Sequence, residues 1–166
     1  MKTAFGIDPG KDGAIVIIEP DGVVRTYKFP RIGLDIDERK LWQIFLTIPL
    51  DAVGTIELVH SIFGTSAKSN FEFGGTYFML RMALAARGLS FRAIPPKEWQ
   101  KKFFVGMTDI KDAKGKRDTK AMALRVATDL FPNVSLINPD KPRAYTPDAG
   151  IVDALLLAEY SRLMLH

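Results

Sequence analysis

The stretch that decides the fold spans residues 5–18 and reads FGIDPGKDGAIVII. An apolar run ends at Asp8, a Pro-Gly turn follows, and a second run rich in β-branched residues starts after Gly13. This pattern predicts a β-hairpin that holds the Asp8 carboxylate at the edge of a sheet. An acid at such a position usually has a chemical role. An aspartate that caps its own turn is a common structural alternative.

The rest of the chain continues the sheet and adds helices. Turns at Pro9-Gly10 and Asp21-Gly22 separate three antiparallel strands. Three such strands followed by alternating helix and strand predict an α/β protein with a mixed five-stranded sheet flanked by helices. This order matches the ribonuclease H-like fold, although other α/β folds begin in the same way. The predicted strands are 3–8, 13–19, 23–29, 52–60 and 90–94, and the predicted helices are 37–48, 70–87, 97–104, 117–130 and 151–164.

Composition limits the class of protein. A chain of 166 residues with 47% hydrophobic and 25% charged residues predicts one globular domain, residues 1–166. Because there is no cysteine and only His60 and His166 are histidines, disulfides and thiolate metal sites are excluded and a histidine-built zinc site is implausible. Without a signal-like segment or an apolar run of membrane-spanning length, we expect a cytoplasmic protein with no membrane partner.

Two further acids lie in apolar surroundings. Glu57 interrupts the apolar strand at 52–60, where a charge is costly unless it is paired or binds a metal. The alternative is that strand alternation turns Glu57 toward solvent. Asp153 lies one turn into a helix whose following residues are nearly all apolar, so it is a candidate to face the sheet. Asp148, just before that helix, is a good N-cap residue.

Three acids on separate buried elements form a plausible set of oxygen ligands for Mg²⁺. Two such ions, roughly 3.5–4 Å apart, can activate a water and stabilise the leaving oxygen in phosphodiester cleavage. This chemistry needs no serine, cysteine or histidine nucleophile, which suits a chain without cysteine and with two histidines.

Several segments together resemble the RuvC family of Holliday-junction resolvases, and most closely its phage and prophage members. They are Gly6-Ile7-Asp8-Pro9-Gly10, Ile56-Glu57, Val59-His60-Ser61, Phe71-Glu72-Phe73-Gly74, Ile94-Pro95-Pro96-Lys97-Glu98-Trp99, Lys116-Arg117-Asp118-Thr119-Lys120 and Asp153-Ala154-Leu155-Leu156-Leu157-Ala158. The resemblance covers nearly the whole chain in order and spacing. It implies Mg²⁺-dependent cleavage of two opposed strands of a four-way DNA junction by a homodimer. Mn²⁺ would substitute for Mg²⁺, no small-molecule cofactor is implied, and the setting would be a bacterial or phage-infected cell.

The resemblance also assigns the metal-binding acids. Asp8, Glu57 and Asp153 match three of the family's four. Relatives often carry an acid-Gly pair near the start of the last helix, where this chain has Ala149-Gly150 with Asp148 one residue earlier. Three alternatives follow. Asp148 supplies the fourth ligand, the chain lacks a fourth ligand, or Ala149 is an engineered substitution that makes the protein inactive.

The segment from Lys97 to Lys120 is rich in Lys and Arg, which suits either a polyanion or an ordinary solvated surface. By resemblance, Lys97, Arg117 and Lys120 approach the scissile strand, and Lys120 joins the catalytic candidates. An exposed aromatic after Glu57 could stack on bases at the junction centre. Phe63 is the better candidate, and Phe71 is as easily a core residue. The predicted DNA-binding residues are Phe63, Lys68, Lys97, Lys101, Lys102, Lys116, Arg117 and Lys120.

The predicted helix at 70–87 is apolar around most of its circumference and should be buried on more than one side. The second cover is either a symmetry mate, as in a C2 dimer, or loops of the same chain. Two other functions compete with a nuclease. One is a half-domain of an actin- or hexokinase-type kinase, which would need a duplicated second half. The other is a non-catalytic junction-binding protein. Ala149 supports this alternative, because relatives often carry an acid at that position.

Overall fold

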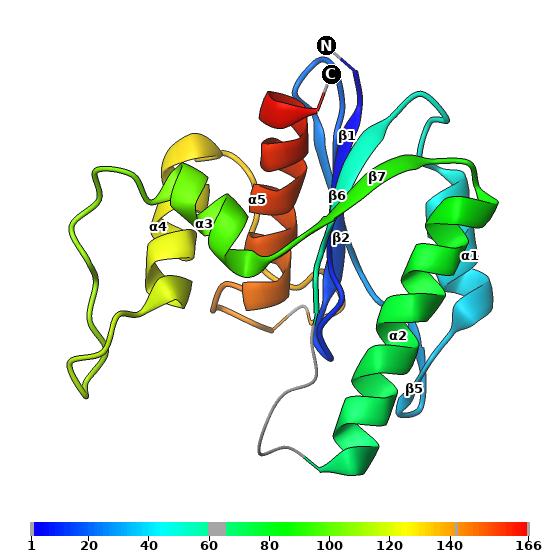
Figure 1. Ribbon diagram of the computed structural model, residues 1–166, viewed down its shortest axis with the longest axis horizontal. Coiled ribbons are helices and arrows are strands. Elements are labelled where there is room, and N and C mark those ends of the chain that lie inside the picture. Colours follow the sequence, from blue (N-terminus) through cyan, green and yellow to red (C-terminus); the bar gives the residue numbers. More distant parts are fainter. Residues whose placement is uncertain (1, 60–65, 142, 166) are drawn as a thin grey trace.

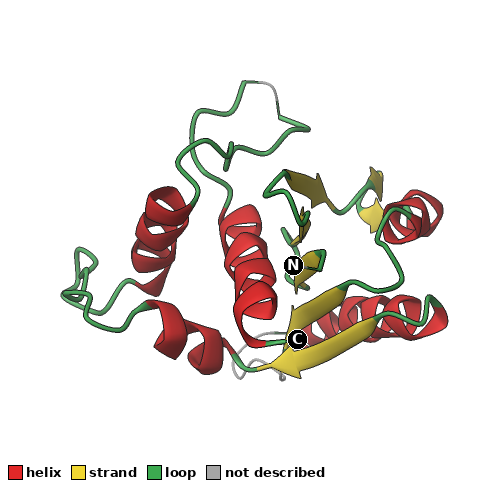
Figure 2. Ribbon diagram, turned by 90° about the horizontal axis from the view of Figure 1, so that it is seen from above, coloured by secondary structure: helices red, strands yellow, loops and turns green. Residues whose placement is uncertain are grey.

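The hairpin predicted at the start of the chain forms the centre of the observed sheet. A computed structural model describes residues 2–59, 66–141 and 143–165. Its main sheet has the order β3-β2-β1-β6-β7, and Figures 1 and 2 show it between two layers of helices. β2 pairs antiparallel with β1 and β3, whereas β1, β6 and β7 run parallel. The strands are β1 Ala4–Asp8, β2 Ala14–Ile18, β3 Val24–Lys28, β6 Val53–Glu57 and β7 Ser90–Ile94.

The predicted mixed five-stranded sheet is therefore confirmed, and each of its faces packs on a separate hydrophobic core. A small hairpin, β4 Arg31–Ile32 and β5 Asp35–Ile36, was not predicted from the sequence. Helices α1 and α2 cover one face, and α3, α4 and α5 cover the other (Figure 1). The helices are α1 Glu38–Leu46, α2 Ala67–Ala86, α3 Pro96–Phe103, α4 Thr119–Leu130 and α5 Ala149–Met164.

Three helices begin two or more residues away from the predicted starts, because capping side chains decide where a helix begins. Ser66 accepts a hydrogen bond from the backbone N–H of Ser69, so α2 begins before residue 70. Asp118 caps α4 in the same way, so this helix starts after residue 117, and Asp148 caps α5, which starts before residue 151.

Helix α5 lies directly against the central strand β1. A Cβ at Gly6 would be 2.2 Å from the Ala154 carbonyl oxygen, so only glycine permits this close contact. Buried hydrogen bonds hold the helix in place, with Ser161 Oγ donating to the Phe5 carbonyl (3.1 Å) and Thr55 Oγ1 donating to the Leu157 carbonyl (2.7 Å). The position of α5 relative to β1 and β6 is thus fixed by backbone contact and buried polar bonds.

The topology brings several element ends together. The parallel strands β1 and β6 end at the same edge of the sheet, and α2, α4 and α5 all begin at that end, the lower end of the molecule in Figure 1. Any chemistry carried by these ends shares one face. Within the described residues, no helix combines the length and the apolar character that a membrane span requires.

Candidate functional site

Strand register places two of the predicted acids side by side. Ile7 of β1 pairs with Ile56 of β6, so the residues that follow, Asp8 and Glu57, end neighbouring strands. Side chains two residues apart in a strand point to the same face. Gly6 faces α5, and therefore so does Asp8. The same reasoning places Glu57 on the α5 side, because Thr55 hydrogen-bonds to that helix.

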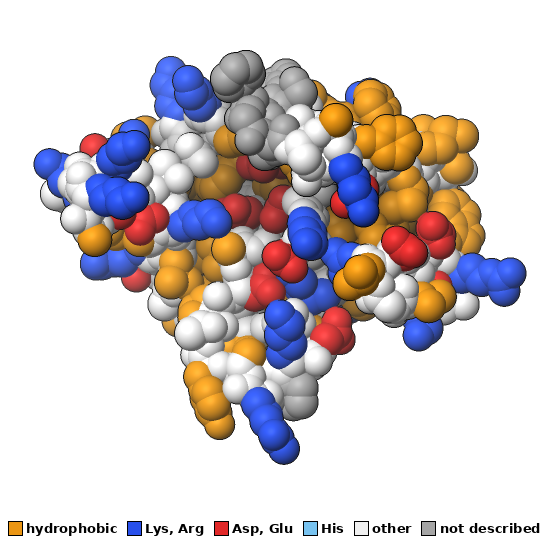
Figure 3. Space-filling model, turned by 90° about the horizontal axis from the view of Figure 1, so that it is seen from below, with side chains coloured by type: hydrophobic (Ala, Val, Ile, Leu, Met, Phe, Trp, Pro, Cys, Tyr) orange, Lys and Arg blue, Asp and Glu red, His pale blue; other side chains and the backbone are white. Residues whose placement is uncertain are grey.

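Asp153, in the second turn of α5, completes the group. Asp8, Glu57 and Asp153 are all half-buried. The charge of Asp8 acts on Glu57, and the charges of Asp8 and Glu57 both act on Asp153. Figure 3 views the same end of the molecule from below. It shows Asp and Glu side chains gathered in the middle of this face, partly within a hollow, with Lys and Arg around them.

Protein hydrogen bonds occupy only part of these carboxylates. The Gly10 backbone N–H donates to Asp8 Oδ1 (2.9 Å), and the Trp99 indole N–H donates to Glu57 Oε1 (3.0 Å). Asp153 has no hydrogen bond or ion pair with any residue that the structure describes. Each carboxylate therefore keeps at least one oxygen for another partner.

Burial and nearby charges shift the pKa values of all three acids. Burial raises the pKa of Glu57 to about 7 against the lowering effect of the Trp99 hydrogen bond, and the charge of Asp8 raises it further. Burial, Asp8 and Glu57 raise the pKa of Asp153 to about 7. Burial also raises the pKa of Asp8, and the charge of Asp148 adds to this, while the Gly10 hydrogen bond and the charges of Lys28 and Lys120 lower it. Like charges gathered at a hollow are a hallmark of functional sites.

The donor set suits a hard divalent cation. A bound Mg²⁺ would relieve the repulsion that the charge of Asp8 exerts on Glu57 and that the charges of Asp8 and Glu57 exert on Asp153. The described part of the chain nevertheless contains no three acid or histidine side chains close enough to form a ready-made ligand group. The assignment of Asp8, Glu57 and Asp153 as metal ligands therefore stays a prediction.

Asp148 has the N-cap position that was one of its two predicted roles. Its Oδ1 accepts from the Ile151 backbone N–H (3.2 Å) and from Lys28 Nζ (2.8 Å). The next two residues differ in their surroundings. Ala149 is exposed, whereas Gly150 is buried. A Cβ at Gly150 would lie only 2.2 Å from the Asp12 carbonyl oxygen. An acid would fit at position 149 but not at position 150.

The predicted DNA-binding cations are exposed; Lys68 lies on α2, and the others lie on α3, on α4 and in the loop between these two helices. Lys120, in the first turn of α4, lies close enough to lower the pKa values of Asp8 and Asp153. Arg117 pairs with Asp109 (2.9 Å), and Lys68 at the start of α2 pairs with Glu72 (3.8 Å). The remaining cations are Lys97, Lys101 and Lys102 on α3 and Lys116 in the loop that precedes α4.

The two aromatic residues predicted to contact DNA or the core, Phe63 and Phe71, differ in what the structure shows of them. Phe63, like His60, lies outside the described residues, so its predicted role as a wedge stays a prediction. Phe71 is 82% exposed, so a core position for it is wrong. It lies in the first turns of α2, where the apolar pattern of the helix alone did not reveal which side faces the sheet.

Two residues of the site were missed from the sequence. Trp99 fixes one oxygen of Glu57, and Lys28 pairs with Asp148 across 120 positions of the chain. Trp99 belongs to the segment Ile94–Trp99, which carries part of the family resemblance, and this could have pointed to it. Lys28 carried no signal, because an alternating strand at a sheet edge ordinarily contains lysines.

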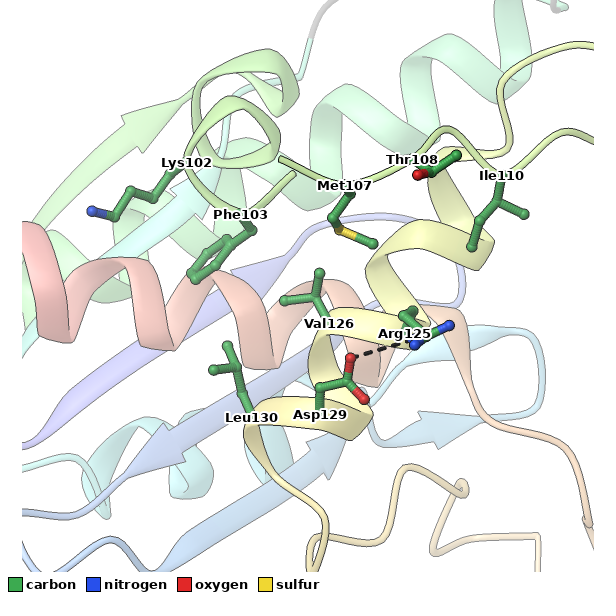
Figure 4. Close-up of a pocket in the computed structure, with 9 residues that line it drawn as sticks. All are labelled: Lys102, Phe103, Met107, Thr108, Ile110, Arg125, Val126, Asp129 and Leu130. Atoms are coloured by element: carbon green, nitrogen blue, oxygen red, sulfur yellow. Dashed lines mark hydrogen bonds and ion pairs between the residues drawn. The ribbon is translucent and has the colours of Figure 1, made fainter. Parts of the chain in front are cut away.

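A separate cavity of about 450 Å³ lies between α3, the following loop and α4 (Figure 4). Its only carboxylate, Asp129, is paired with Arg125 (3.3 Å), and Lys102 extends away from the other lining side chains. None of the predicted metal ligands lines this cavity. The acid-bearing face is therefore the candidate site.

The raised pKa values predict how the stability of the metal-free protein varies with pH. Glu57 and Asp153 bind a proton more tightly in the folded chain, with pKa values of about 7, than at their ordinary values of 4.5 and 3.8. Their contribution to stability is fully present below the ordinary values and is lost as the pH rises through about 7. In EDTA, we expect the free energy of unfolding from urea denaturation to be lower at about pH 8 than at about pH 5.5.

The control for this measurement is the double variant Glu57→Gln/Asp153→Asn, which removes both titrating groups. Its stability should depend less on pH than that of the unmodified protein. At about pH 8 it should also be the more stable of the two, because neutral side chains avoid the burial cost of charge. The same pH dependence in both proteins would show that these carboxylates are not perturbed.

Comparison with known proteins agrees with the fold. No protein-family model and no curated protein matches the chain in sequence. Among solved structures, Thermus thermophilus RuvC in complex with a Holliday junction substrate is similar, with a TM-score of 0.61 and 15% identity over 98% of this chain and 96% of that chain. Another Thermus thermophilus RuvC structure has a TM-score of 0.51 and 16% identity over 97% and 96% of the two chains. The chain has the fold of RuvC, as the resemblance implied.

Proposed function

We propose that this protein is a structure-selective DNA endonuclease that resolves four-way junctions by divalent-metal-dependent hydrolysis of opposed strands. The observation that carries the proposal is the position of Asp8, Glu57 and Asp153. They come from two neighbouring strand ends and from α5, and they share one face of a RuvC-like fold. Residues 1–166 would act as one nuclease domain, because the strands form one main sheet with helices on both faces.

In this proposal Asp8, Glu57 and Asp153 hold the cation, with Asp148 as the remaining candidate ligand. Mg²⁺ is the expected ion and Mn²⁺ an effective substitute, since both accept carboxylate oxygens. When bound, such ions activate water and stabilise the leaving oxygen. The chain's own contribution is positional. Trp99 and the Gly10 N–H each fix one oxygen of a ligand, and Lys120 provides a positive charge beside the acids for a DNA phosphate.

Exposed cations near the acids support DNA as the substrate. Lys97, Lys101 and Lys102 lie along α3, and Lys116 and Arg117 extend the basic surface toward Lys120. Phosphate contacts from such residues supply most of the sequence-independent affinity of a nuclease for DNA. A four-way junction as the preferred form rests on the family resemblance and on the RuvC-like fold.

An apolar stripe on α2 supports a homodimer. Phe71, Phe78 and Met82 are 82%, 64% and 68% exposed, whereas Tyr77, Leu80 and Leu84 of the same helix are buried against the sheet. Gly74 and Gly75 lie between the exposed residues, with open space where their Cβ atoms would be. No loop within the described residues covers this face. A second copy of α2 could approach closely at the glycines, and a C2 dimer would offer one site to each opposed strand.

The dimer prediction is tested by changing the stripe. Phe78→Glu places a charge on the proposed apolar interface, and we expect a dimer at micromolar concentration to become a monomer in sedimentation velocity experiments. Leu34→Glu is the matched control, because Leu34 is 92% exposed in the turn between β4 and β5 and should leave the dimer intact. An unmodified protein that stays monomeric yet cuts opposed strands in concert would exclude this assembly.

The decisive experiment for the function is cleavage of a synthetic mobile four-way junction with Mg²⁺, beside a linear duplex of the same sequence. We expect paired nicks in opposed strands of the junction and none in the duplex. Binding is measured separately by gel shift in EDTA. Junction binding without cleavage in Mg²⁺ or Mn²⁺ would instead identify a catalytically inactive junction-binding protein, the alternative that Ala149 raises. Equal cutting of the junction and the duplex would show that the enzyme does not select four-way junctions.

A further inference from the structure

Lys28 is a buried lysine within the candidate site. It is the last residue of β3, and its side chain is only 8% exposed. Its ammonium group donates to Asp148 Oδ1 (2.8 Å) and to the Asp12 backbone carbonyl. A lysine is rarely buried unless a partner compensates its charge. Here the compensating carboxylate belongs to the residue that could serve as a fourth metal ligand.

Strand register places Lys28 in the same row as a predicted metal ligand. Ala14 of β2 pairs with Asp8 on one side and with Lys28 on the other. Residues directly opposite one another in a sheet point their side chains to the same face. Lys28 therefore projects to the α5 side, as Asp8 does, and its charge lowers the pKa of Asp8.

Helix α5 shows where the ammonium lies relative to Asp153. Gly150 is three residues before Asp153, so the two share one side of the helix. A Cβ at Gly150 would lie 3.2 Å from Lys28 Nζ. The space beside Asp153 in which an acid at position 150 would sit is thus bounded by a lysine ammonium and by the Asp12 carbonyl.

We propose that Lys28 is a built-in counter-cation of the carboxylate cluster, which keeps Asp148 from acting as a metal ligand. Asp8, Glu57 and Asp153 then hold one divalent cation firmly, and a second cation binds only weakly in the absence of DNA. The inference rests on the proposed function and deepens it. Its physical basis is that Lys28 cancels the charge of Asp148 and repels any further cation nearby.

The test is the number of Mn²⁺ ions bound by the metal-free protein, counted by electron paramagnetic resonance and isothermal titration calorimetry without DNA. The unmodified protein should bind one ion firmly per chain. Lys28→Met should raise the affinity for a second Mn²⁺ ion by about tenfold or more, because it removes a repelling charge and frees Asp148. Lys28→Met/Asp148→Asn should lose this gain while keeping the helix cap, since asparagine caps as well as aspartate.

Lys40→Met is the matched control, because it removes one positive charge from an exposed lysine on α1, paired with Asp37 (3.8 Å), and should leave Mn²⁺ binding unchanged. Lys28→Gln removes the charge but keeps a hydrogen-bond donor, and it replaces Lys28→Met if circular dichroism shows that variant to be unfolded. Unchanged Mn²⁺ binding in a folded Lys28 variant would overturn the proposal. Failure of the proposed function gives a different pattern, namely firm Mn²⁺ binding that persists in Asp8→Asn or no binding in any protein.

Discussion

Asp8→Asn is expected to lower junction cleavage by about a thousandfold or more, because the cation that Asp8 helps to hold supplies several kcal/mol of transition-state stabilisation. Junction affinity in EDTA should stay nearly unchanged, since in the proposed function the basic residues of α3, α4 and their loop contact the DNA phosphates. Asparagine has nearly the same shape and can still accept the Gly10 hydrogen bond at its carbonyl oxygen. Cleavage and gel-shift assays on the same junction measure the two effects.

Asp129→Asn is the matched control for this variant. Asp129 is an exposed aspartate paired with Arg125 in the separate cavity between α3 and α4, so its loss should leave cleavage unchanged. A second readout is Mn²⁺ binding, which Asp8→Asn should weaken and Asp129→Asn should not. An active Asp8→Asn protein would exclude Asp8 as a metal ligand, and a loss of junction binding equal to the loss of cleavage would point to misfolding.

Ala149→Asp is expected to raise Mg²⁺-dependent cleavage by about tenfold or more when Mg²⁺ is limiting, since it adds a carboxylate beside the cations. Ala149 is exposed, and it lies one helical turn before Asp153 on the same side of α5. An acid in the first turn also favours the helix dipole. The measurement is the rate of junction cleavage as a function of Mg²⁺ concentration.

Neighbouring positions give the controls for Ala149→Asp. Gly150→Asp introduces the same group one residue later, but its Cβ would collide with the Asp12 carbonyl, so it should destabilise the fold. Asp148→Asn keeps the helix cap and should have little effect on cleavage, whereas Asp148→Ala should cost about 1 kcal/mol of stability through loss of the cap. An inert Ala149→Asp with an inactive Asp148→Asn would identify Asp148 as the fourth ligand.

Much of the fold followed from local sequence pattern. The hairpin at residues 5–18 combines two apolar runs, a Pro-Gly turn and β-branched residues, and these signals need no distant partner. Helix starts were less accurate, because a single capping side chain such as Ser66 or Asp148 moves a boundary that periodicity leaves open. The β4-β5 hairpin was missed because two-residue strands are too short to show a period.

The candidate site was only partly accessible from sequence. Asp8, Glu57 and Asp153 stood out because each is an acid in an apolar context. The sheet register explains why Asp8 and Glu57 share the face that α5, which carries Asp153, covers. Lys28 and Trp99 did not stand out, since their significance depends on which carboxylate each one meets. Those partners lie 120 and 42 positions away, so only the folded topology reveals them.

The contact at Gly6 bears on how far sequences with this architecture can diverge. The separation between β1 and α5 is set at Gly6, where backbone meets backbone, and is held by the buried hydroxyls of Ser161 and Thr55. Mutations elsewhere in the core can then accumulate over generations without moving Asp153 away from Asp8. A lineage under such a constraint would keep its three-dimensional arrangement long after its residues had become unrecognisable. Solved structures with only 15% and 16% identity match nearly the whole chain, which agrees with such a constraint.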